Sequence, residues 1–467
     1  MHLAQVIADE ATRPAGALIA IAVGAIAILL FLIIKLKFHA FYSLIIVSVL
    51  TALVAGVSVG DLLGVIQGPF GTTLGNVAML IGFGAVLGRV IEISGGAQVL
   101  AESLIRRFGD KRAPFALSLA SFLFAFPIFL DAGFIVMLPI IYQVARRLKG
   151  SLLLYALPAT GAFLTMHGLV PPHPGPTAAA GIVGVDVGLV VLISVLVAIP
   201  VYLLSGPVVG TAIAKRMPHF PVPDLLGEAK DRSDQKLPSF WLVIFLLLLP
   251  LVLIFLNTGA AALATNGTIT DDTAIYALLT TVGATPIALL ITSILAIVLL
   301  IVVPNWGDVG KRMEDVVDDA LGPIASILLI TGAGGMFGGV LTATGIGAVL
   351  ADGLNDLGLP LIVAAFAIAA IMRVAQGSAT VATTTAASLM APAVMAAGEV
   401  SPLQLALIVV AMGAGGISLS HVNDSGFWLV SRFLGLDTKQ ALQSWSVIST
   451  VVGFSAFAIV GIAYLFT

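Results

Sequence analysis

Long apolar stretches alternate with short polar breaks along almost the whole chain. Apolar runs of about 20 residues are long enough to cross the hydrocarbon of a bilayer, and they recur from Gly16 to the C-terminus. Two apolar stretches, 114–146 and 359–398, are interrupted near their middles, and we predict that each forms a re-entrant hairpin. We predict full spans at residues 16–34, 40–58, 76–94, 151–170, 178–205, 239–257, 274–303, 322–342, 402–420 and 442–466.

Polar breaks rich in glycine and proline recur in corresponding places in the two halves. The first half contains FPIFLDAG (126–133) and TMHGLVPPHPGPT (165–177), and the second contains MRVAQGSATVATTT (372–385) and SLSHVNDSG (418–426). Hydrocarbon offers no partners to loose backbone groups, so non-helical peptide survives at that depth only inside protein or beside a water-filled cavity. Paired breaks of this kind indicate the binding site of a transporter.

The two halves also match when the first is shifted by about 250 positions. Gly84 then meets Gly334, and Gly88 meets Gly338. Each half has about five spans and one hairpin, and an odd number of spans inserts the halves in opposite orientations. We therefore predict an all-α polytopic membrane protein with two inverted repeats and broken helices at the site. The repeats are residues 1–214 and 239–467, joined by a hydrophilic cytoplasmic linker at 215–238.

Positive charge assigns a side to the loops of this layout. The Lys and Arg groups fall on one side, which we take as cytoplasmic because basic residues concentrate there, and the opposite loop 257–273 has none. Two amphipathic segments, 98–107 and 348–357, are predicted to lie along the interface. Replacing either hairpin by an ordinary pair of spans leaves this sidedness unchanged, so charge does not test re-entrance.

Composition narrows the class of protein further. Of 467 residues, 59% are hydrophobic and 10% are charged, against about 25% charged in soluble domains. The net charge of −3 and the dispersed basic residues argue against nucleic acid as a partner. There are no cysteines, which excludes disulfides and thiolate metal sites. HExxH does not occur, and the one GxSxG match, at 56–60, comes with no recognisable nucleophile–base constellation, so we expect no enzyme. Asp9 and Glu10 before the first span argue against a signal peptide.

The breaks of the first half contain three titratable candidates. Asp131 is a carboxylate at membrane depth, which is a functional hypothesis by default; it binds a proton or cation, or it caps a half-helix. His167 and His173 titrate near neutral pH and suit proton coupling, unless each only satisfies broken backbone. Thr165 is a candidate for binding substrate hydroxyls.

The breaks of the second half contain an arginine, an aspartate and several hydroxyl or amide groups. Arg373 suits bidentate binding of a carboxylate, and the alternative is a structural ion pair or interface contact. The tip that follows, Gln376 to Thr380, opens a half-helix and would aim N–H groups at an anion. Asp424 is a proton carrier or a structural partner of His421 or Arg373. The predicted binding residues of this half are Arg373, Gln376, Ser378, Thr380, His421, Asn423 and Ser425.

Three motifs carry a resemblance to a known family: FPIFLDAGFIVMLPI (126–140), HGLVPPHPGPTAAA (167–180) and SHVNDSGFWLVSRF (420–433). With them the chain resembles the gluconate permease family of the ion-transporter superfamily. The resemblance implies a proton-coupled symporter of gluconate or a related sugar acid in the bacterial inner membrane, without a cofactor beyond the coupling ion. Some relatives take other small carboxylates or D-serine, so a sodium-coupled transporter of such a substrate is the alternative.

The superfamily also implies how such a protein moves. It implies a homodimer in which a mobile transport domain slides like an elevator against a scaffold. On that resemblance we expect the scaffold and the dimer contact at residues 16–58 and 239–303. The transport parts would then lie at 76–205 and 322–467.

Overall fold

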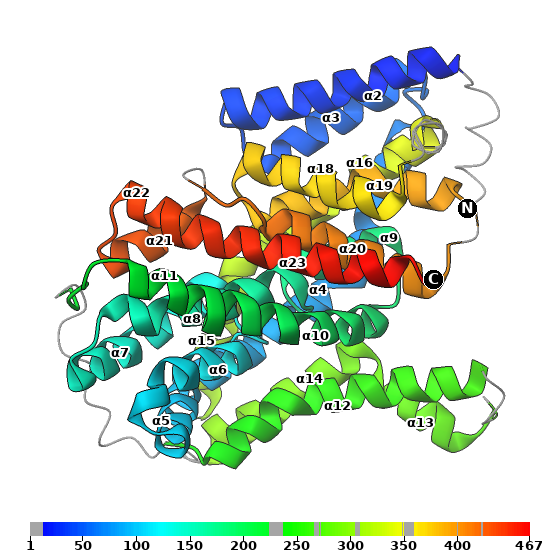
Figure 1. The fold of residues 1–467 in the computed structure, drawn as a ribbon. Helices are drawn as coiled ribbons and strands as arrows, with labels where there is room; N and C mark the ends of the chain where they lie inside the picture. The colour runs from blue at the N-terminus through cyan, green and yellow to red at the C-terminus, as the bar shows by residue number, and fades with distance from the viewer. Residues whose placement is uncertain are drawn as a thin grey trace.

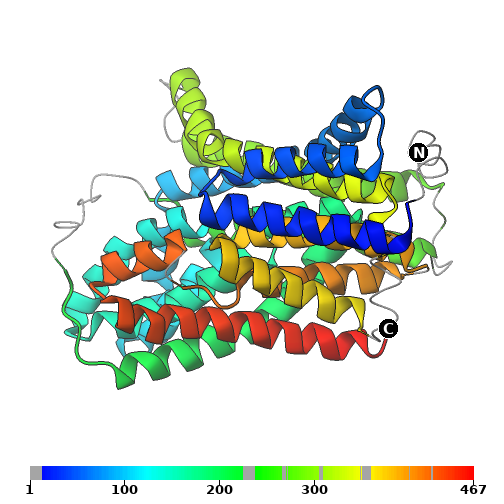
Figure 2. The same cartoon turned by 90° about the horizontal axis from the view of Figure 1, so that it is seen from above.

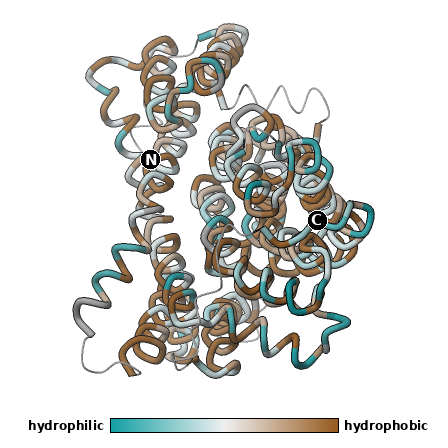
Figure 3. Tube along the Cα trace, turned by 90° about the vertical axis from the view of Figure 1, so that its left-hand side faces the viewer, coloured by the Kyte–Doolittle hydropathy of each residue, from teal (hydrophilic) through white to brown (hydrophobic). Residues whose placement is uncertain are grey.

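The computed structural model describes residues 13–223, 237–265, 270, 272–303, 309–347, 349, 359–398, 400–421 and 424–467. Within these residues the chain is helical and has no β-strand. Nine helical segments of this part are long and apolar enough to cross a membrane. The predicted class, an all-α polytopic membrane protein, is confirmed. Figure 3 looks along the helices from one end and shows mostly apolar helices with polar residues in the end loops.

The first half begins with three helices and an amphipathic arm: α2 (Ala15–Leu30), α3 (Ala40–Ala55), α4 (Leu62–Ile93) and α5 (Gly96–Phe108). The predicted hairpin consists of α6 (Ala113–Phe124) and α7 (Leu130–Leu148), and a broken span follows as α8 (Leu152–Leu169) and α9 (Pro174–Val183). The last span is α10 (Val187–Leu203), a π-helical segment (Leu204–Gly210) and α11 (Thr211–Arg216). The first predicted amphipathic segment, 98–107, falls inside α5.

The second half has a similar order of helices. It begins with α12 (Phe240–Thr265), α13 (Ala274–Gly283), α14 (Thr285–Ile297), α15 (Val309–Leu321) and α16 (Ala325–Ala343). The hairpin stretch is α18 (Leu361–Gln376) and α19 (Ala379–Ala396), and the broken span is α20 (Pro402–Ile417) and α21 (Ser425–Leu434). The chain ends with α22 (Thr438–Ala441), a π-helical segment (Leu442–Ser446) and α23 (Val447–Tyr464). Figures 1 and 2 show α23 lying alongside α10, with which it packs.

Three predicted spans have wrong boundaries. The span at 76–94 begins earlier, at Leu62, because α4 continues through Pro69. Pro69 packs closely on Gly339 of α16, where a Cβ would lie 2.4 Å from its Cγ. The helix is therefore stabilised by tertiary packing that an apolar run does not reveal.

The spans at 178–205 and 274–303 are each divided. The first divides because Gly184 ends α9 with a φ of +80° and Asp186 starts α10 by accepting a hydrogen bond from the N–H of Leu189 at 2.8 Å. The second divides at Ala284, before a proline in the first turn of α14. The predicted segment 348–357 and most of the linker 215–238 lie outside the described residues.

The break between α8 and α9 and the turn between α18 and α19 have simple local causes. Prolines at 171, 172, 174 and 176 cannot donate backbone hydrogen bonds, so α8 ends at Leu169 and α9 starts anew at Pro174. At the second hairpin, Gly377 takes a φ of +83°, a conformation that favours glycine. Ser378 then caps α19 by accepting from the N–H of Val381 at 3.3 Å.

Glycines bring the broken helices and the hairpins into backbone contact. A Cβ on Gly413 of α20 would lie 2.5 Å from the carbonyl oxygen of Gly168 on α8, so the backbones of the two broken helices are in close contact there. Gly88 of α4 approaches the first hairpin: a Cβ there would lie 2.6 Å from the carbonyl oxygen of Pro127. Gly338 of α16 approaches α19, with 3.0 Å to the carbonyl oxygen of Ser388. Each long helix therefore holds one hairpin close to the crossing point.

Candidate functional site

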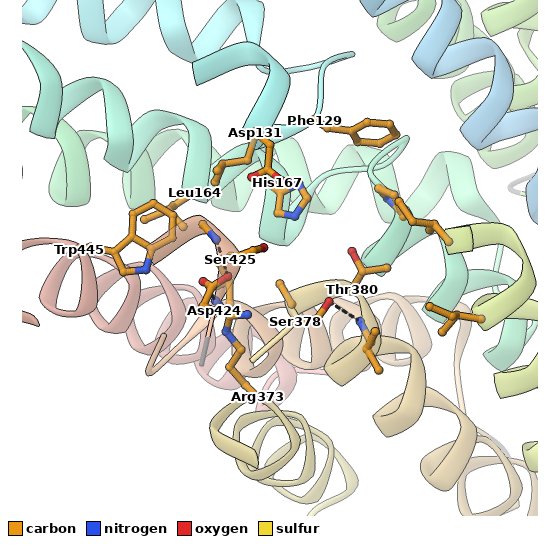
Figure 4. A pocket seen from close by; sticks show the side chains of 18 residues that line it. Phe129, Asp131, Leu164, His167, Arg373, Ser378, Thr380, Asp424, Ser425 and Trp445 are labelled. Carbon is orange, nitrogen blue, oxygen red and sulfur yellow. Dashed lines mark hydrogen bonds and ion pairs between the residues drawn. The ribbon is translucent and has the colours of Figure 1, made fainter. Parts of the chain in front are cut away.

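The broken helices and hairpin tips surround one pocket of about 310 Å³. This lies at the lower end of the range of about 300–1,000 Å³ that is usual for ligand sites. Apolar side chains from α8, α16 and α20 complete the wall. The polar residues that line it are Asp131, His167, Arg373, Ser378, Thr380, Asp424 and Ser425 (Figure 4). The pocket therefore unites residues from both predicted hairpins and both predicted breaks.

Four helices begin at this pocket, namely α7, α9, α19 and α21. Their first residues, from Phe129, Pro174, Ser378 and Asp424 onward, line it. The N-terminus of a helix carries unpaired N–H groups and the positive end of the helix dipole. Four such ends facing one cavity make it a favourable environment for an anion.

The four helix starts differ in how they are capped. In the second half, Ser378 caps α19 with its side chain, and Asp424 caps α21 by accepting from the N–H of Gly426 at 2.9 Å. In the first half, Phe129 and His173 occupy the cap positions of α7 and α9 and make no side-chain cap hydrogen bond. The start of α7 therefore keeps its N–H groups free of side-chain caps, whereas the start of α9 has few N–H groups to offer because Pro174 and Pro176 carry none.

Arg373, in the last turn of α18, is buried and already engaged inside the protein. It is 2% exposed; its guanidinium donates to the carboxylate of Asp424 and to the carbonyl oxygen of Gly377. The structural ion pair that the sequence left open as an alternative is therefore present. Asp424 also accepts a hydrogen bond from Ser420, and the indole N–H of Trp445 donates to the Ser420 hydroxyl at 2.6 Å.

Asp131 lies in the first turn of α7 and keeps an exposed side chain within the pocket. It does not cap the helix, because the residue at the cap position is Phe129 and no side-chain cap is made there. Figure 4 places Asp131 and His167 on one side of the pocket, across from Arg373, Asp424 and Ser425. The carboxylate of Asp131 therefore faces the space that a ligand would occupy.

The two histidines of the first half have different positions. His167 lines the pocket, whereas His173 is absent from its lining and is 2% exposed. Its Nε2 lies 2.8 Å from the carbonyl oxygen of Ala125, and because a carbonyl can only accept, the imidazole donates. The ring centroids of His167 and His173 are 5.1 Å apart. His173 thus fastens the start of α9 to the tip of the first hairpin.

Other predicted site residues do not line the pocket or lie outside the description. Thr165 is buried behind it, and its hydroxyl donates to the carbonyl oxygen of Gly161 at 2.8 Å. His421 is also absent from the lining. Asn423 lies outside the described residues, and so does the side chain of Gln376, whose backbone ends α18. In the described chain, no group of three His, Asp or Glu residues is placed to hold a metal ion.

Trp445 and Ser420 are site residues that the sequence did not single out. Trp445 lies between Ser444 and Ser446 at the start of the last predicted span, where neither residue type nor spacing sets it apart. Ser420 belongs to the SLSHVNDSG break, but several other polar residues there offered equal candidates. The signal that could have pointed to them is the possible pairing of Arg373 with Asp424. Two buried charges require further hydrogen-bond partners, and these two residues supply such hydrogen bonds.

Broken helices that meet at an internal pocket, within a bundle of membrane-spanning helices, define a secondary transporter rather than an enzyme. The sequence profile described as GntP family permease matches residues 17–466. The chain belongs to this family, as the resemblance implied, and is a multi-pass protein of the bacterial inner membrane.

Named relatives and one solved structure agree with this assignment. The chain is 40% identical to the inner membrane permease YgbN of Escherichia coli (strain K12), with 95% of this chain and 97% of the relative covered. It is 34% identical to a gluconate permease of Pseudomonas aeruginosa, with 94% of each covered. It is also 34% identical to the high-affinity gluconate transporter of E. coli, covering 93% of this chain and 96% of the relative.

The solved structure is that of the YdaH transporter of Alcanivorax borkumensis. It matches with a TM-score of 0.67 at 16% identity, covering 92% of this chain and 99% of that chain. At this identity the likeness concerns the fold, and it is a transporter fold.

Proposed function

We propose that the protein imports gluconate or a related sugar acid together with a proton. The observation that carries the proposal is the pocket where four helix N-termini meet beside the free carboxylate of Asp131 and the hydroxyls of Ser378, Thr380 and Ser425. Such a site offers positive potential for a carboxylate and hydrogen-bonding groups for a polyol. Relatives that are 34% identical over nearly the whole chain are named gluconate permease or gluconate transporter.

The substrate carboxylate would bind at the helix ends, and the sugar hydroxyls would bind at the side-chain hydroxyls. The N–H groups at the start of α7 are free of side-chain caps. Ser378, Thr380 and Ser425 line the wall that α19 and α21 contribute, with Asn423 as a further proposed ligand next to them in sequence. Arg373 adds positive potential, although two of its N–H groups are directed at Asp424 and Gly377.

The proton would be carried by Asp131. An ionised carboxylate in the pocket repels an anionic substrate, and protonation removes that repulsion. Substrate and proton then stabilise each other in the pocket, which couples their movement. His167 is a second candidate, since it lines the same cavity. Asp424 is a weaker candidate because its carboxylate is held by Arg373, Ser420 and Gly426.

We further propose that the halves are inverted repeats. A shift of 250 residues places the end of α4 at Ile93 on the end of α16 at Ala343, and it matches α6 to α9 with α18 to α21 within two residues at each end. The turns Gly95 and Gly345 have φ angles of +81° and +73°. Pairs of broken helices in such repeats suit alternating access around a site at the midplane.

An elevator movement in a homodimer is the proposed mechanism. In Figure 1, α2 and α3 lie on one side of the bundle that holds the pocket, and α12 to α14 lie on the other. These flanking helices are the proposed scaffold, and residues 76–205 and 322–467 form the proposed moving part. The division supports the mechanism because all four half-helices of the pocket belong to the same part.

The test is uptake of labelled gluconate into vesicles that contain the purified protein. An imposed pH gradient, alkaline inside, should drive accumulation above equilibrium without sodium. Asp131→Asn should abolish this accumulation, while Asp61→Asn, an exposed carboxylate away from the pocket, should leave it unchanged. Accumulation that needs sodium and ignores the pH gradient would instead assign a sodium-coupled transporter, and no accumulation with any sugar acid would refute the proposal.

A further inference from the structure

Trp445 contacts the pocket, the second break and the start of α21 at once. It lies in the π-helical segment Leu442–Ser446, an irregularity that often occurs at functional sites. Its ring packs on the first turn of α21, where a Cβ on Gly426 would lie 3.1 Å from the indole. Trp445 also lines the pocket, although only 1% of its surface is exposed.

Ser420 connects this indole to the ion pair. Its hydroxyl accepts from the indole N–H and donates to the carboxylate of Asp424. The chain of hydrogen bonds thus runs from Trp445 through Ser420 to Asp424, where it meets the guanidinium of Arg373. Arg373 continues to the carbonyl oxygen of Gly377 at the tip of the second hairpin. The network links four separate parts of the second half.

Each hydrogen bond of this chain restricts the conformation of the next side chain in it. Arg and Trp side chains have several rotamers, and a buried polar chain holds one arrangement only when its members are satisfied. One carboxylate oxygen of Asp424 receives Arg373 and Ser420, which leaves the other for the N–H of Gly426. Movement of Ser420 would therefore disturb both the guanidinium and the first turn of α21, which presents Ser425 to the pocket.

We propose that Trp445 and Ser420 are positioning residues of the transport site. They fix Asp424, and through it they fix Arg373 and the α21 start in the geometry that binds substrate. This inference rests on the proposed function, since binding is read from uptake of the sugar acid. Neither residue has to touch the substrate for the role to hold.

The first experiment measures uptake kinetics of Ser420→Ala and Trp445→Phe. Trp445→Phe loses one hydrogen bond of the chain and Ser420→Ala loses two, so the apparent KM for the transported sugar acid should rise about tenfold, with Vmax nearly unchanged. Ser420→Thr keeps the hydroxyl and should restore the KM. The double variant should resemble the worse single one, because both act through the same oxygen of Asp424.

Two matched controls separate this role from general disturbance. Ser444→Ala removes a buried hydroxyl that bonds only to carbonyls of its own turn, and Trp241→Phe changes a tryptophan that is 70% exposed. Both should keep the wild-type KM. An unchanged KM in Ser420→Ala and Trp445→Phe, or additive effects in the double variant, would overturn the inference.

A second measurement needs no substrate. The melting temperatures of wild type, Ser420→Ala, Trp445→Phe and the double variant form a cycle in purified protein. Non-additive shifts are expected from a connected network, and additive shifts would contradict it. If the wild type accumulates no sugar acid, the proposed function fails while this cycle still decides whether the network exists.

Discussion

The two breaks that face the pocket differ in how they handle charge and helix ends. In the second half, both helix starts carry side-chain caps, and Arg373 is paired with Asp424. In the first half, both helix starts lack side-chain caps, and Asp131 keeps an exposed carboxylate in the pocket. Prolines and the His173 contact to Ala125 hold that break instead.

This difference suggests a division of labour between the halves. The charges of the second half compensate each other inside the protein, which suits a rigid wall of the site. The free helix ends and the carboxylate of the first half remain available to a ligand and a proton. Breaking the ion pair of the second half should therefore affect stability first, and removing the carboxylate of the first half should affect transport first.

Asp424→Asn should have the largest effect. It leaves the charge of buried Arg373 without a charged partner, which costs about 3–5 kcal/mol, while an asparagine can still cap α21. Melting of the purified protein should drop sharply and uptake should vanish, and adding Arg373→Gln should recover part of the stability. The control is Asp110→Asn, since its pair with Arg147 is exposed and worth about 1 kcal/mol or less. A wild-type melting temperature for Asp424→Asn would contradict the proposal that the second half is a rigid wall of the site.

Asp131→Asn should show the opposite pattern. Its free energy of unfolding should stay within about 0.5 kcal/mol of that of the wild type, because the residue neither caps α7 nor lies in the buried core. Accumulation driven by a pH gradient should be lost, while exchange of internal for external substrate at equal pH should persist. Loss of exchange as well would indicate that Asp131 binds the substrate rather than the proton.

His173→Phe tests what holds the first break together. The ring shape is nearly kept, but the carbonyl oxygen of Ala125 loses its donor, which costs about 1–3 kcal/mol. Thermal melting should fall accordingly, whereas His219→Phe, in an exposed loop, should change nothing. Equal melting temperatures of His173→Phe and His219→Phe would mean that the prolines alone stabilise this break.

Ser378→Asp should produce a small change in stability and a clear change in transport. An aspartate caps α19 as well as serine does and places a negative charge at its start. The free energy of unfolding should stay within about 1 kcal/mol of that of the wild type, while the KM for an anionic substrate should rise several-fold. A neutral polyol as competitor would serve as the control, because its binding should respond much less to the added charge.

The sequence predicts the breaks better than the helices between them. Apolar runs do not show where α4 begins, because its first turns are held by the contact of Pro69 with Gly339. Prolines and glycines do show where α8 and α18 end, because their backbone limits act locally. Residue type also indicated that Arg373 and Asp131 matter, but only tertiary structure shows that one is paired and the other is free. Trp445 was missed because its role depends entirely on contacts distant in sequence.

The crossing of α8 and α20 at Gly168 and Gly413 limits how this protein can be redesigned. Even one added methyl group at Gly413 would push a backbone carbonyl aside, so the distance between these helices is a constant of the architecture. Engineering that seeks a larger or smaller cargo should leave this pivot alone. The position open to such changes is Leu164, an apolar side chain of α8 that lines the pocket, whereas Ile417 packs on Gly168 and belongs to the crossing.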